Sequence, residues 1–497
     1  MSKESHRLEL STSTPAGASE PAVVPGRGGP ASSAYEERVG RLQAQYATIP
    51  AGASIRLAKR TSNLFRTRAR TAVRGLDVAA FDGVIEIDVG AATADVGAMT
   101  TYEHLVDATL PHGLMPLVVP QLKTITLGGA ITGLGIESSS FRNGMPHESM
   151  LEIDVMTGDG RVVTARPDNE HRDLFHGFPN SYGTLGYALR VKIELEPVAA
   201  FVHLRHLRFD SVADAIPVIE AVCAEGRHGG WAEGRHGGWA GHASNPVHFV
   251  DGTVFGPGEC YVTLGSWAGS APYLSDYTYT GIYYRSLPER SEDWLTARDY
   301  LWRWDTDWFW CSRAFGAQRP WVRRALGRRY LRSDVYWKVV ALEERYHVKA
   351  AIDRRRGEPE RENVIQDVEV PVGRLAEFVA DFHREVPIAP IWLCPLRQRD
   401  PAATWDLYRL DPAELYVNVG FWSSVPLTES MDPAHHNRWV EAEVERLGGR
   451  KSLYSTAFYD EEHFWRLYNG PAYRDLKQKY DRESRLLDLY AKCVQSR

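Results

Sequence analysis

Residues 126–140 read TLGGAITGLGIESSS and place Gly128, Gly129, Gly133 and Gly135 close together. Glycines at this density let a backbone approach a ligand closely, and free N–H groups in such a stretch can bind phosphate oxygens. The third glycine of a GxGxxG pattern is absent because Ser138 stands there, and the residues ESSSFRNG that follow do not predict a helix. The segment therefore predicts either a phosphate-contacting loop or a tight turn in a β-rich domain, and it disfavours a Rossmann arrangement.

Length and composition indicate a globular protein of two or three domains, because the chain has 497 residues and 43% of them are hydrophobic. The net charge of −6 gives no reason to expect nucleic acid as a partner. The five cysteines are dispersed and form no CxxC pair, which favours reduced thiols. No secretory signal and no run of eighteen apolar residues is present, so we expect a cytoplasmic location.

The order of predicted elements favours an α+β fold rather than a regular βαβ array. Residues 1–33 are rich in Ser, Pro, Ala and Gly and predict a disordered tail, followed by an amphipathic helix from Tyr35. Alternating and turn patterns then predict the following elements: a strand over 83–91, a helix over 100–110, a hairpin over 150–165, and strands over 189–198 and 414–422.

The octapeptide AEGRHGGW occurs at 224–231 and again at 232–239. A glycine-rich tandem duplication predicts an expanded surface loop. Its two histidines, His228 and His236, have no carboxylate or cysteine at a ligand spacing, so no metal site is predicted.

Several motifs in order resemble the PCMH-type FAD-binding domain of the vanillyl-alcohol-oxidase superfamily. They are the glycine-rich stretch, the Asp-Gly turn at 159–160, the DLF triplet at 173–175 and the GTLG stretch at 183–186. The resemblance implies a two-subdomain FAD-binding domain over 34–199 and an α+β substrate (cap) domain over 200–440. It also implies a C-terminal helical segment, 441–497, that packs back on the FAD domain. No His or Cys stands where the superfamily links flavin covalently, so non-covalent FAD is expected.

A narrower resemblance is to the delta-24-sterol reductase group. It is carried by GIESSSFRNG and by the segments 364–372, 390–396, 414–420 and 458–481. Unlike the eukaryotic members, this chain shows no N-terminal membrane helix. Its first phosphate segment, SIRLAKRTSNLFR (54–66), is also poorer in glycine. Arg56, Lys59 and Arg60, with Thr61 and Ser62, can bind phosphate through charge-assisted hydrogen bonds or form a solvated basic strand and turn.

The resemblance assigns the flavin nucleotide to three groups of residues: Arg56 and Lys59; Thr126, Leu127, Gly128, Gly129, Ala130, Thr132, Gly133, Gly135, Ile136, Glu137, Ser138 and Ser139; and Gly183, Thr184 and Gly186.

Three polar residues are candidates for supplying a proton to the substrate. Lys338 lies in the apolar run VYWKVVAL and predicts a buried lysine, unless its side chain snorkels from a strand edge. Tyr416 and Gln366 lie in segments that flank the flavin in this superfamily, with core packing and a structural amide as the alternatives.

The middle region combines an aromatic cluster with a basic segment. Residues 299–311 contain Trp302, Trp304, Trp308 and Trp310, which suit a lipid site or a bilayer interface. Residues 318–332 form a basic amphipathic segment that suits an anionic membrane surface, with an ordinary solvated helix as the alternative.

Bacterial relatives of the sterol reductases include the reductase of tuberculostearic-acid synthesis, which reduces the 10-methylene group of a phospholipid acyl chain. The resemblance, the aromatic cluster and the basic segment favour this reaction, with NADPH or NADH as electron donor and contact with the inner face of the cell membrane. A delta-24-sterol reductase and an FAD-dependent oxidase or dehydrogenase of an alcohol or sugar are the alternatives. The sequence predicts no oligomeric state.

Overall fold

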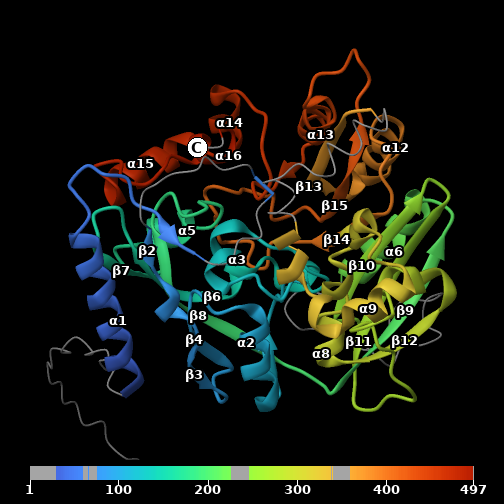
Figure 1. Ribbon diagram of the computed structural model, residues 1–497, viewed down its shortest axis with the longest axis horizontal. Coiled ribbons are helices and arrows are strands. Elements are labelled where there is room, and N and C mark those ends of the chain that lie inside the picture. Colours follow the sequence, from blue (N-terminus) through green and yellow to red (C-terminus); the bar gives the residue numbers. More distant parts are fainter. Residues whose placement is uncertain are drawn as a thin grey trace, which may run out of the picture.

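The structure is a computed structural model that describes residues 30–59, 65–66, 75–224, 246–336, 338–339 and 359–495. It contains two large sheets with helices around them and a two-stranded parallel pair between β1 and β2 (Figure 1). Helix α1 begins at Pro30, within the segment predicted to be a disordered tail. Residues 1–29 and most of the duplicated loop, 225–239, lie outside the described residues.

The first sheet is built from the N-terminal part of the chain. Its strands lie in the order β3-β4-β8-β6-β7, with β5 paired to β8, and every pairing within it is antiparallel. The elements of this region are α1 (Pro30–Ala47), β1 (Leu57–Ala58), β2 (Leu76–Asp77), β3 (Val84–Asp88), β4 (Thr93–Gly97), α2 (Tyr102–Thr109), β5 (Leu114–Pro116), α3 (Leu127–Gly133), α4 (Ser140–Asn143), β6 (Met150–Met156), β7 (Val162–Ala165), α5 (Arg172–Gly177) and β8 (Tyr187–Pro197). The predicted strands, hairpin and helix between 83 and 198 are confirmed.

The second sheet has eight strands in the order β12-β9-β11-β10-β14-β15-β13-β16, all paired antiparallel. Its elements are β9 (Phe201–Phe209), α6 (Val212–Ala224), β10 (Phe249–Gly256), β11 (Glu259–Ala268), α7 (Tyr283–Ser286), β12 (Glu292–Thr296), α8 (Ala297–Leu301), α9 (Pro320–Tyr330), β13 (Arg361–Pro371), α12 (Leu375–Glu385), β14 (Ile391–Leu396), β15 (Tyr416–Pro426), α13 (His435–Arg446) and β16 (Arg450–Lys451). Helices α6, α12 and α13 cover one face through a core of Val, Leu and Phe side chains.

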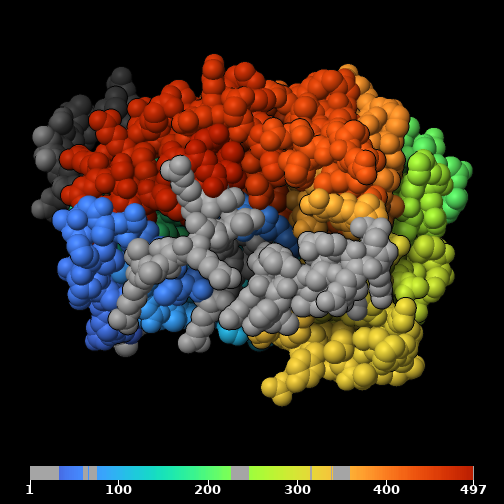
Figure 2. All heavy atoms as spheres, turned by 45° about the horizontal axis from the view of Figure 1, so that its top comes forward, coloured from blue at the N-terminus to red at the C-terminus, as the bar shows by residue number. Residues whose placement is uncertain are grey.

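Three C-terminal helices follow the second sheet: α14 (Glu461–Leu467), α15 (Gly470–Tyr480) and α16 (Leu489–Cys493). Helix α15 packs on α5, and Lys477 Nζ donates to the Thr184 carbonyl at 2.8 Å. In the space-filling view the red C-terminal part borders blue N-terminal residues at one end of the molecule and orange residues of the second sheet at the other (Figure 2). The end of the chain therefore contacts the region of the first sheet.

Two local predictions around the glycine-rich stretch are wrong. Residues 127–133 form the helix α3 rather than an extended loop, and 140–143 form the single turn α4. Thr126 caps α3 by accepting a hydrogen bond from the Gly129 N–H at 3.2 Å. Burial of Leu127 and Ile131 adds to this cap, and together they outweigh the low helix propensity of glycine.

The tryptophan cluster lies inside the molecule, so its placement at a bilayer interface is wrong. Trp302, Trp304, Trp308 and Trp310 are all buried. Trp308, Phe309 and Trp310 also have consecutive positive φ angles of 55°, 53° and 57°. This conformation costs about 1–2 kcal/mol for each non-glycine residue, and such strain is concentrated at functional sites.

Candidate functional site

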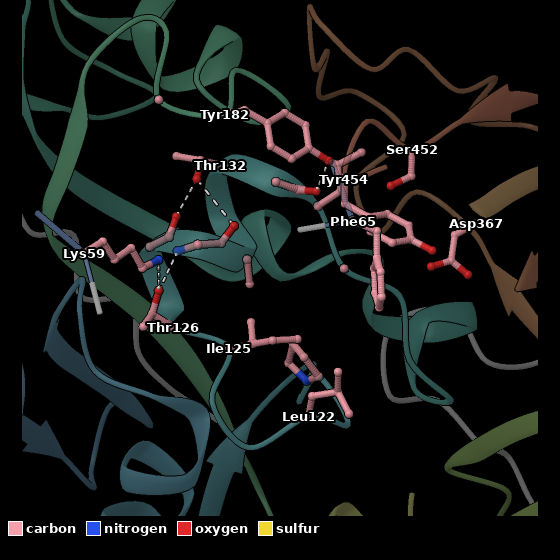
Figure 3. A pocket seen from close by; sticks show the side chains of 18 of the residues that line it. Lys59, Phe65, Leu122, Ile125, Thr126, Thr132, Tyr182, Asp367, Ser452 and Tyr454 are labelled. Atoms are coloured by element: carbon pink, nitrogen blue, oxygen red, sulfur yellow. Dashed lines mark hydrogen bonds between the residues drawn. The ribbon is translucent and has the colours of Figure 1, made fainter. Parts of the chain in front are cut away.

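A cavity of about 680 Å³ lies where the two sheets meet. The first-sheet region contributes residues 54–59, helix α3 and the loop 182–188, and the second sheet contributes residues of β13, β14 and β15. Figure 3 shows Lys59, Thr126 and Thr132 at one end of this cavity, with Asp367 and Tyr454 at the other. The cavity therefore joins the glycine-rich segment to the second sheet.

The glycine-rich end is held together by short polar contacts. Lys59 Nζ donates to Thr126 Oγ1 at 3.0 Å, and Thr132 Oγ1 donates to the Gly128 carbonyl at 2.7 Å (Figure 3). At Gly128 a Cβ atom would lie 2.8 Å from the Ala98 Cβ and 2.9 Å from its carbonyl oxygen. Only glycine therefore allows α3 to pack this closely against the end of β4.

Most of the predicted cofactor residues line the cavity. They are Arg56, Lys59, Thr126, Gly128, Gly129, Ala130, Thr132, Gly133, Gly135, Ile136, Glu137, Gly183 and Gly186.

The other four predicted cofactor residues lie behind the cavity wall. Leu127 is core, and Ser138 shares a hydrogen bond of 2.7 Å with the Tyr300 hydroxyl. Ser139 Oγ donates to the Leu117 carbonyl at 2.8 Å, and Thr184 Oγ1 donates to the Ser181 carbonyl at 2.7 Å. Their side chains are engaged within the protein. Arg60, Thr61 and Ser62 lie outside the described residues.

Sequence reasoning missed two amides that line the cavity, Gln121 and Asn418. Among the described residues, no hydrogen-bond partner is found for Oε1 of Gln121 or for Oδ1 of Asn418, although both atoms are buried; the Gln121 side chain also bonds to the Glu137 carboxyl. A buried polar atom left unpaired costs about 1–3 kcal/mol, so a ligand with a polar edge is expected to pair with them. The ring system of a flavin has carbonyl and N–H groups along one edge, which fits these amides.

The second-sheet end of the cavity holds a half-buried carboxyl, Asp367, on β13. Asn418 Nδ2 donates to Asp367 Oδ1 at 3.2 Å, and the Tyr454 hydroxyl also bonds to this carboxyl. Trp422 Nε1 in turn donates to the Tyr454 hydroxyl at 2.7 Å. Burial raises the pKa of Asp367 to about 7, against the opposing effects of these hydrogen bonds and of Lys451.

An aromatic wall adjoins this carboxyl and consists of Trp308, Phe309, Trp392 and Trp422, which all line the cavity. The Phe309 ring lies 4.4 Å from the Trp422 ring and 5.3 Å from the Trp392 ring, between centroids, in edge-to-face contacts. This end of the cavity is thus largely apolar, with few polar groups. The strained segment at 308–310 places two of these rings.

The structure does not bring the three predicted proton donors into the cavity. Lys338 lies in a helical segment, its side chain is 76% exposed, and its Nζ lies 3.3 Å from Asp334 Oδ2. The prediction of a buried lysine is therefore wrong. Gln366 donates from Nε2 to Asn437 at 2.6 Å, on the helix-covered face of β13. Successive side chains point to opposite faces of a strand, so its neighbour Asp367 faces the cavity instead.

Tyr416 lies on the cavity face of β15 but beyond the end of the cavity. Its hydroxyl accepts a hydrogen bond from the Asp411 N–H at 3.2 Å, and it is not among the lining residues. Asn418, two residues further along the same face, is the residue that reaches the cavity.

Within the described part of the chain, no group of three His, Cys, Asp or Glu side chains is placed to hold a metal ion. Across those same residues no helix is long and apolar enough to cross a membrane. His228 and His236 lie outside them. The five cysteines, all described, are free thiols, as predicted.

Comparison with known proteins agrees with this geometry. A sequence model of the FAD binding domain family matches residues 47–166, which include the glycine-rich segment. The Delta(24)-sterol reductase of Arabidopsis thaliana is 26% identical over 460 residues, covering 85% of this chain and 77% of the plant protein. The human Delta(24)-sterol reductase is 26% identical over 428 residues, covering 83% and 76%. Cytokinin dehydrogenase 6 of Oryza sativa subsp. japonica is 34% identical over 139 residues, 27% of this chain and 26% of that protein. The chain is therefore an FAD-binding oxidoreductase of the PCMH type, related over most of its length to the Delta(24)-sterol reductases.

Proposed function

We propose that this protein reduces a carbon–carbon double bond in a membrane lipid. The favoured substrate is a 10-methylene fatty acyl chain of a phospholipid, which becomes a 10-methyl chain, with NADPH as the electron donor. The observation that carries the proposal is the composition of the cavity, in which the flavin-binding segment is continuous with an aromatic wall. When bound and reduced, FAD supplies a hydride to a carbon acceptor.

The side chains of this protein divide the remaining tasks. Arg56 and Lys59, with the N–H groups near Gly129, would hold the phosphates of the nucleotide; both side chains line the cavity, and Lys59 bonds to Thr126. Gln121 and Asn418 would offer polar atoms to the flavin ring.

An isolated alkene in a lipid tail has no polar group to orient it. Its position must therefore be set by shape and apolar contact. Trp308, Phe309, Trp392 and Trp422 provide such contact beside the predicted flavin position. The same wall would exclude water and disfavour a polar substrate such as a sugar.

Helix α9 supports a phospholipid as the source of the acyl chain. Trp321 and Tyr330 on this helix are 64% and 51% exposed. Arg324, Arg328 and Arg329 of the same segment are exposed as well, on the two sides of a break in the helix at Gly327, where φ is 68°. Exposed aromatic rings among cations suit the headgroup region of an anionic bilayer. We therefore propose peripheral contact between this helix and the inner face of the cell membrane.

The membrane contact is tested with phosphatidylglycerol vesicles. Replacing Arg324 and Arg329 together with Glu should reduce sedimentation with these vesicles and leave bound flavin unchanged. The double variant of Arg474 and Arg482, two exposed arginines of the C-terminal region, carries the same charge change and should bind as wild type. Equal binding of both variants would refute the contact.

The reaction is tested anaerobically with the flavin as its own indicator. NADPH should bleach the bound flavin, and a 10-methylene-acyl phospholipid should restore its colour. Colour restored only by a delta-24 sterol would assign the sterol reductase alternative, which the named relatives support equally. Hydrogen peroxide formed in air with an alcohol or sugar, without bleaching by NADPH, would assign the oxidase alternative.

A further inference from the structure

The second sheet places the Asp367 carboxyl at the cavity, opposite a position that has no side chain. The residue opposite it on β15 is Gly420, and a Cβ there would lie 2.5 Å from Asp367 Oδ1 and 2.7 Å from the Trp422 ring. Any larger residue at 420 would push against both the carboxyl and the aromatic wall. The strand pair is therefore shaped to hold a carboxyl against an apolar surface.

Neighbouring side chains fix the orientation of this carboxyl. Asn418 binds Oδ1, and Tyr454, held in place by Trp422, binds the carboxyl as well. All four residues line the cavity. Asn418 keeps Oδ1 unpaired among the described residues, so it has capacity left for a ligand.

We propose that Asp367 is the acid that protonates the substrate double bond, a step that rests on the proposed function. Saturating the bond requires two hydrogens, one of which reduced FAD supplies with its electron pair. The other is a proton: the O–H bond of Asp367 breaks, its electron pair stays on the carboxylate, and a C–H bond forms at the second alkene carbon. The π bond breaks as both C–H bonds form, and water returns a proton to the carboxylate after product leaves. Tyr454 is a positioning residue.

Two buried carboxyls nearby are less suited to this step. Glu369 lies two residues along the same strand, bonds to the Tyr408 hydroxyl and is not among the cavity-lining residues. Glu137 lines the cavity, and burial raises its pKa well above the usual value, but its Oε1 is occupied by the Gln121 N–H at 2.7 Å and it belongs to the glycine-rich segment rather than to the end of the cavity with the aromatic wall. A general acid must lie at the substrate site and must be protonated. Asp367 lines the cavity at the end that holds the aromatic wall, and burial raises its pKa to about 7.

The protonation of Asp367 depends on four surrounding groups. Burial raises the pKa to about 7, and the Asn418 and Tyr454 hydrogen bonds and the charge of Lys451 oppose this rise. Lys451 is itself engaged, since it donates to Ser455 Oγ at 3.1 Å and lies 3.6 Å from Glu441. Glu369 adds a carboxyl on the same face of β13, and burial raises its pKa to about 8.

The test separates flavin reduction from flavin reoxidation in the holoenzyme. Asp367→Asn should bind FAD with wild-type affinity, measured by flavin fluorescence, and should be bleached by NADPH at the wild-type rate. Its reoxidation by the lipid alkene should be at least about 100-fold slower, which is the usual range for losing a general acid. Glu360→Gln, at an exposed carboxyl next to β13 that does not line the cavity, is the control and should reoxidise within about twofold of wild type, because neutral changes at the surface away from a site have small effects.

Two further measurements test the assignment without requiring Asp367→Asn to be active. Tyr454→Phe removes a hydrogen bond that lowers the Asp367 pKa, so the alkaline fall in reoxidation rate should move to higher pH. Infrared difference spectra of wild type should show a carboxylic-acid band that disappears between about pH 5.5 and pH 8.5 and is missing in Asp367→Asn.

The outcomes distinguish this proposal from the proposed function. A wild-type flavin that no alkene lipid reoxidises refutes the proposed function, and the proton-donor assignment falls with it. A wild type that turns over while Asp367→Asn reoxidises equally fast refutes only the assignment. If Asp367→Asn fails to fold, an unshifted pH profile in Tyr454→Phe, or no titrating acid band in wild type, overturns the assignment.

Discussion

Replacing Asp367 with Asn should make the protein more resistant to unfolding, and increasingly so as the pH rises. The side chain is half-buried at the cavity wall, and desolvation raises its pKa from about 3.8 in the unfolded chain to about 7 in the folded protein. Folding therefore favours the protonated form, and the folded protein loses stability as the pH rises from the lower value through the higher one. One pKa unit corresponds to about 1.4 kcal/mol, so the full penalty is about 4 kcal/mol.

Most of this penalty falls within an accessible pH range. Integrating the two titrations between pH 5 and pH 8 gives a loss of about 3 kcal/mol in the wild type that Asp367→Asn lacks. Ionisable groups away from residue 367 titrate alike in both proteins and cancel in the difference, whereas Glu369 loses the part of its raised pKa that the Asp367 charge contributes. The assay is urea unfolding of flavin-free protein, followed by tryptophan fluorescence, at several pH values. Parallel stability profiles for the two proteins would refute the raised pKa and remove the physical basis for a neutral carboxyl in the cavity.

Three further substitutions test other parts of the structure. Gly128→Val should abolish FAD retention, because its Cβ would overlap Ala98, whereas Gly40→Ala, with nothing within 4 Å, should keep the flavin-to-protein absorbance ratio of wild type. Lys59→Met should weaken FAD about tenfold in a fluorescence titration, since one charge-assisted phosphate contact contributes about 1–2 kcal/mol; unchanged affinity would remove Lys59 from the site. Arg323→Ala should destabilise the fold by about 3 kcal/mol, because this buried guanidinium donates to the Tyr279 carbonyl at 2.8 Å and the Thr306 carbonyl at 3.3 Å. Arg324→Ala, exposed on the same helix, should stay within about 0.5 kcal/mol, and equal melting temperatures would contradict the burial of Arg323.

The parts of the fold set by local patterns could be predicted from the sequence. The hairpin at 150–165 follows from alternating residues around Gly158-Asp159-Gly160, and both are local features. The sequence predicted that the glycine-rich segment would contact the cofactor, but it did not predict that residues 127–133 form a helix. Its helix depends on packing against Ala98 and on the cap from Thr126, which are contacts made by the tertiary structure.

The proton-donor candidates show where sequence reasoning stops. Gln366 and Asp367 are neighbours, and only the pairing of β13 with β15 and the cover from α13 decide which one faces the cavity. Lys338 lies in an apolar run, yet it is exposed, because hydrophobic neighbours do not fix the direction of a helical side chain. The amphipathic pattern of 318–332 likewise did not reveal that Arg323 points inward. Such choices depend on partners distant in sequence.

The central claim, reduction of a lipid double bond by bound FAD, is tested most directly by anaerobic reoxidation. The holoenzyme is reduced with NADPH in a stopped-flow cell and mixed with vesicles that contain a 10-methylene-acyl phospholipid. Flavin absorbance should return, with one flavin reoxidised for each 10-methyl chain that mass spectrometry detects. Flavin that stays reduced with this lipid and with a delta-24 sterol, while oxygen alone restores its colour, would contradict the claim.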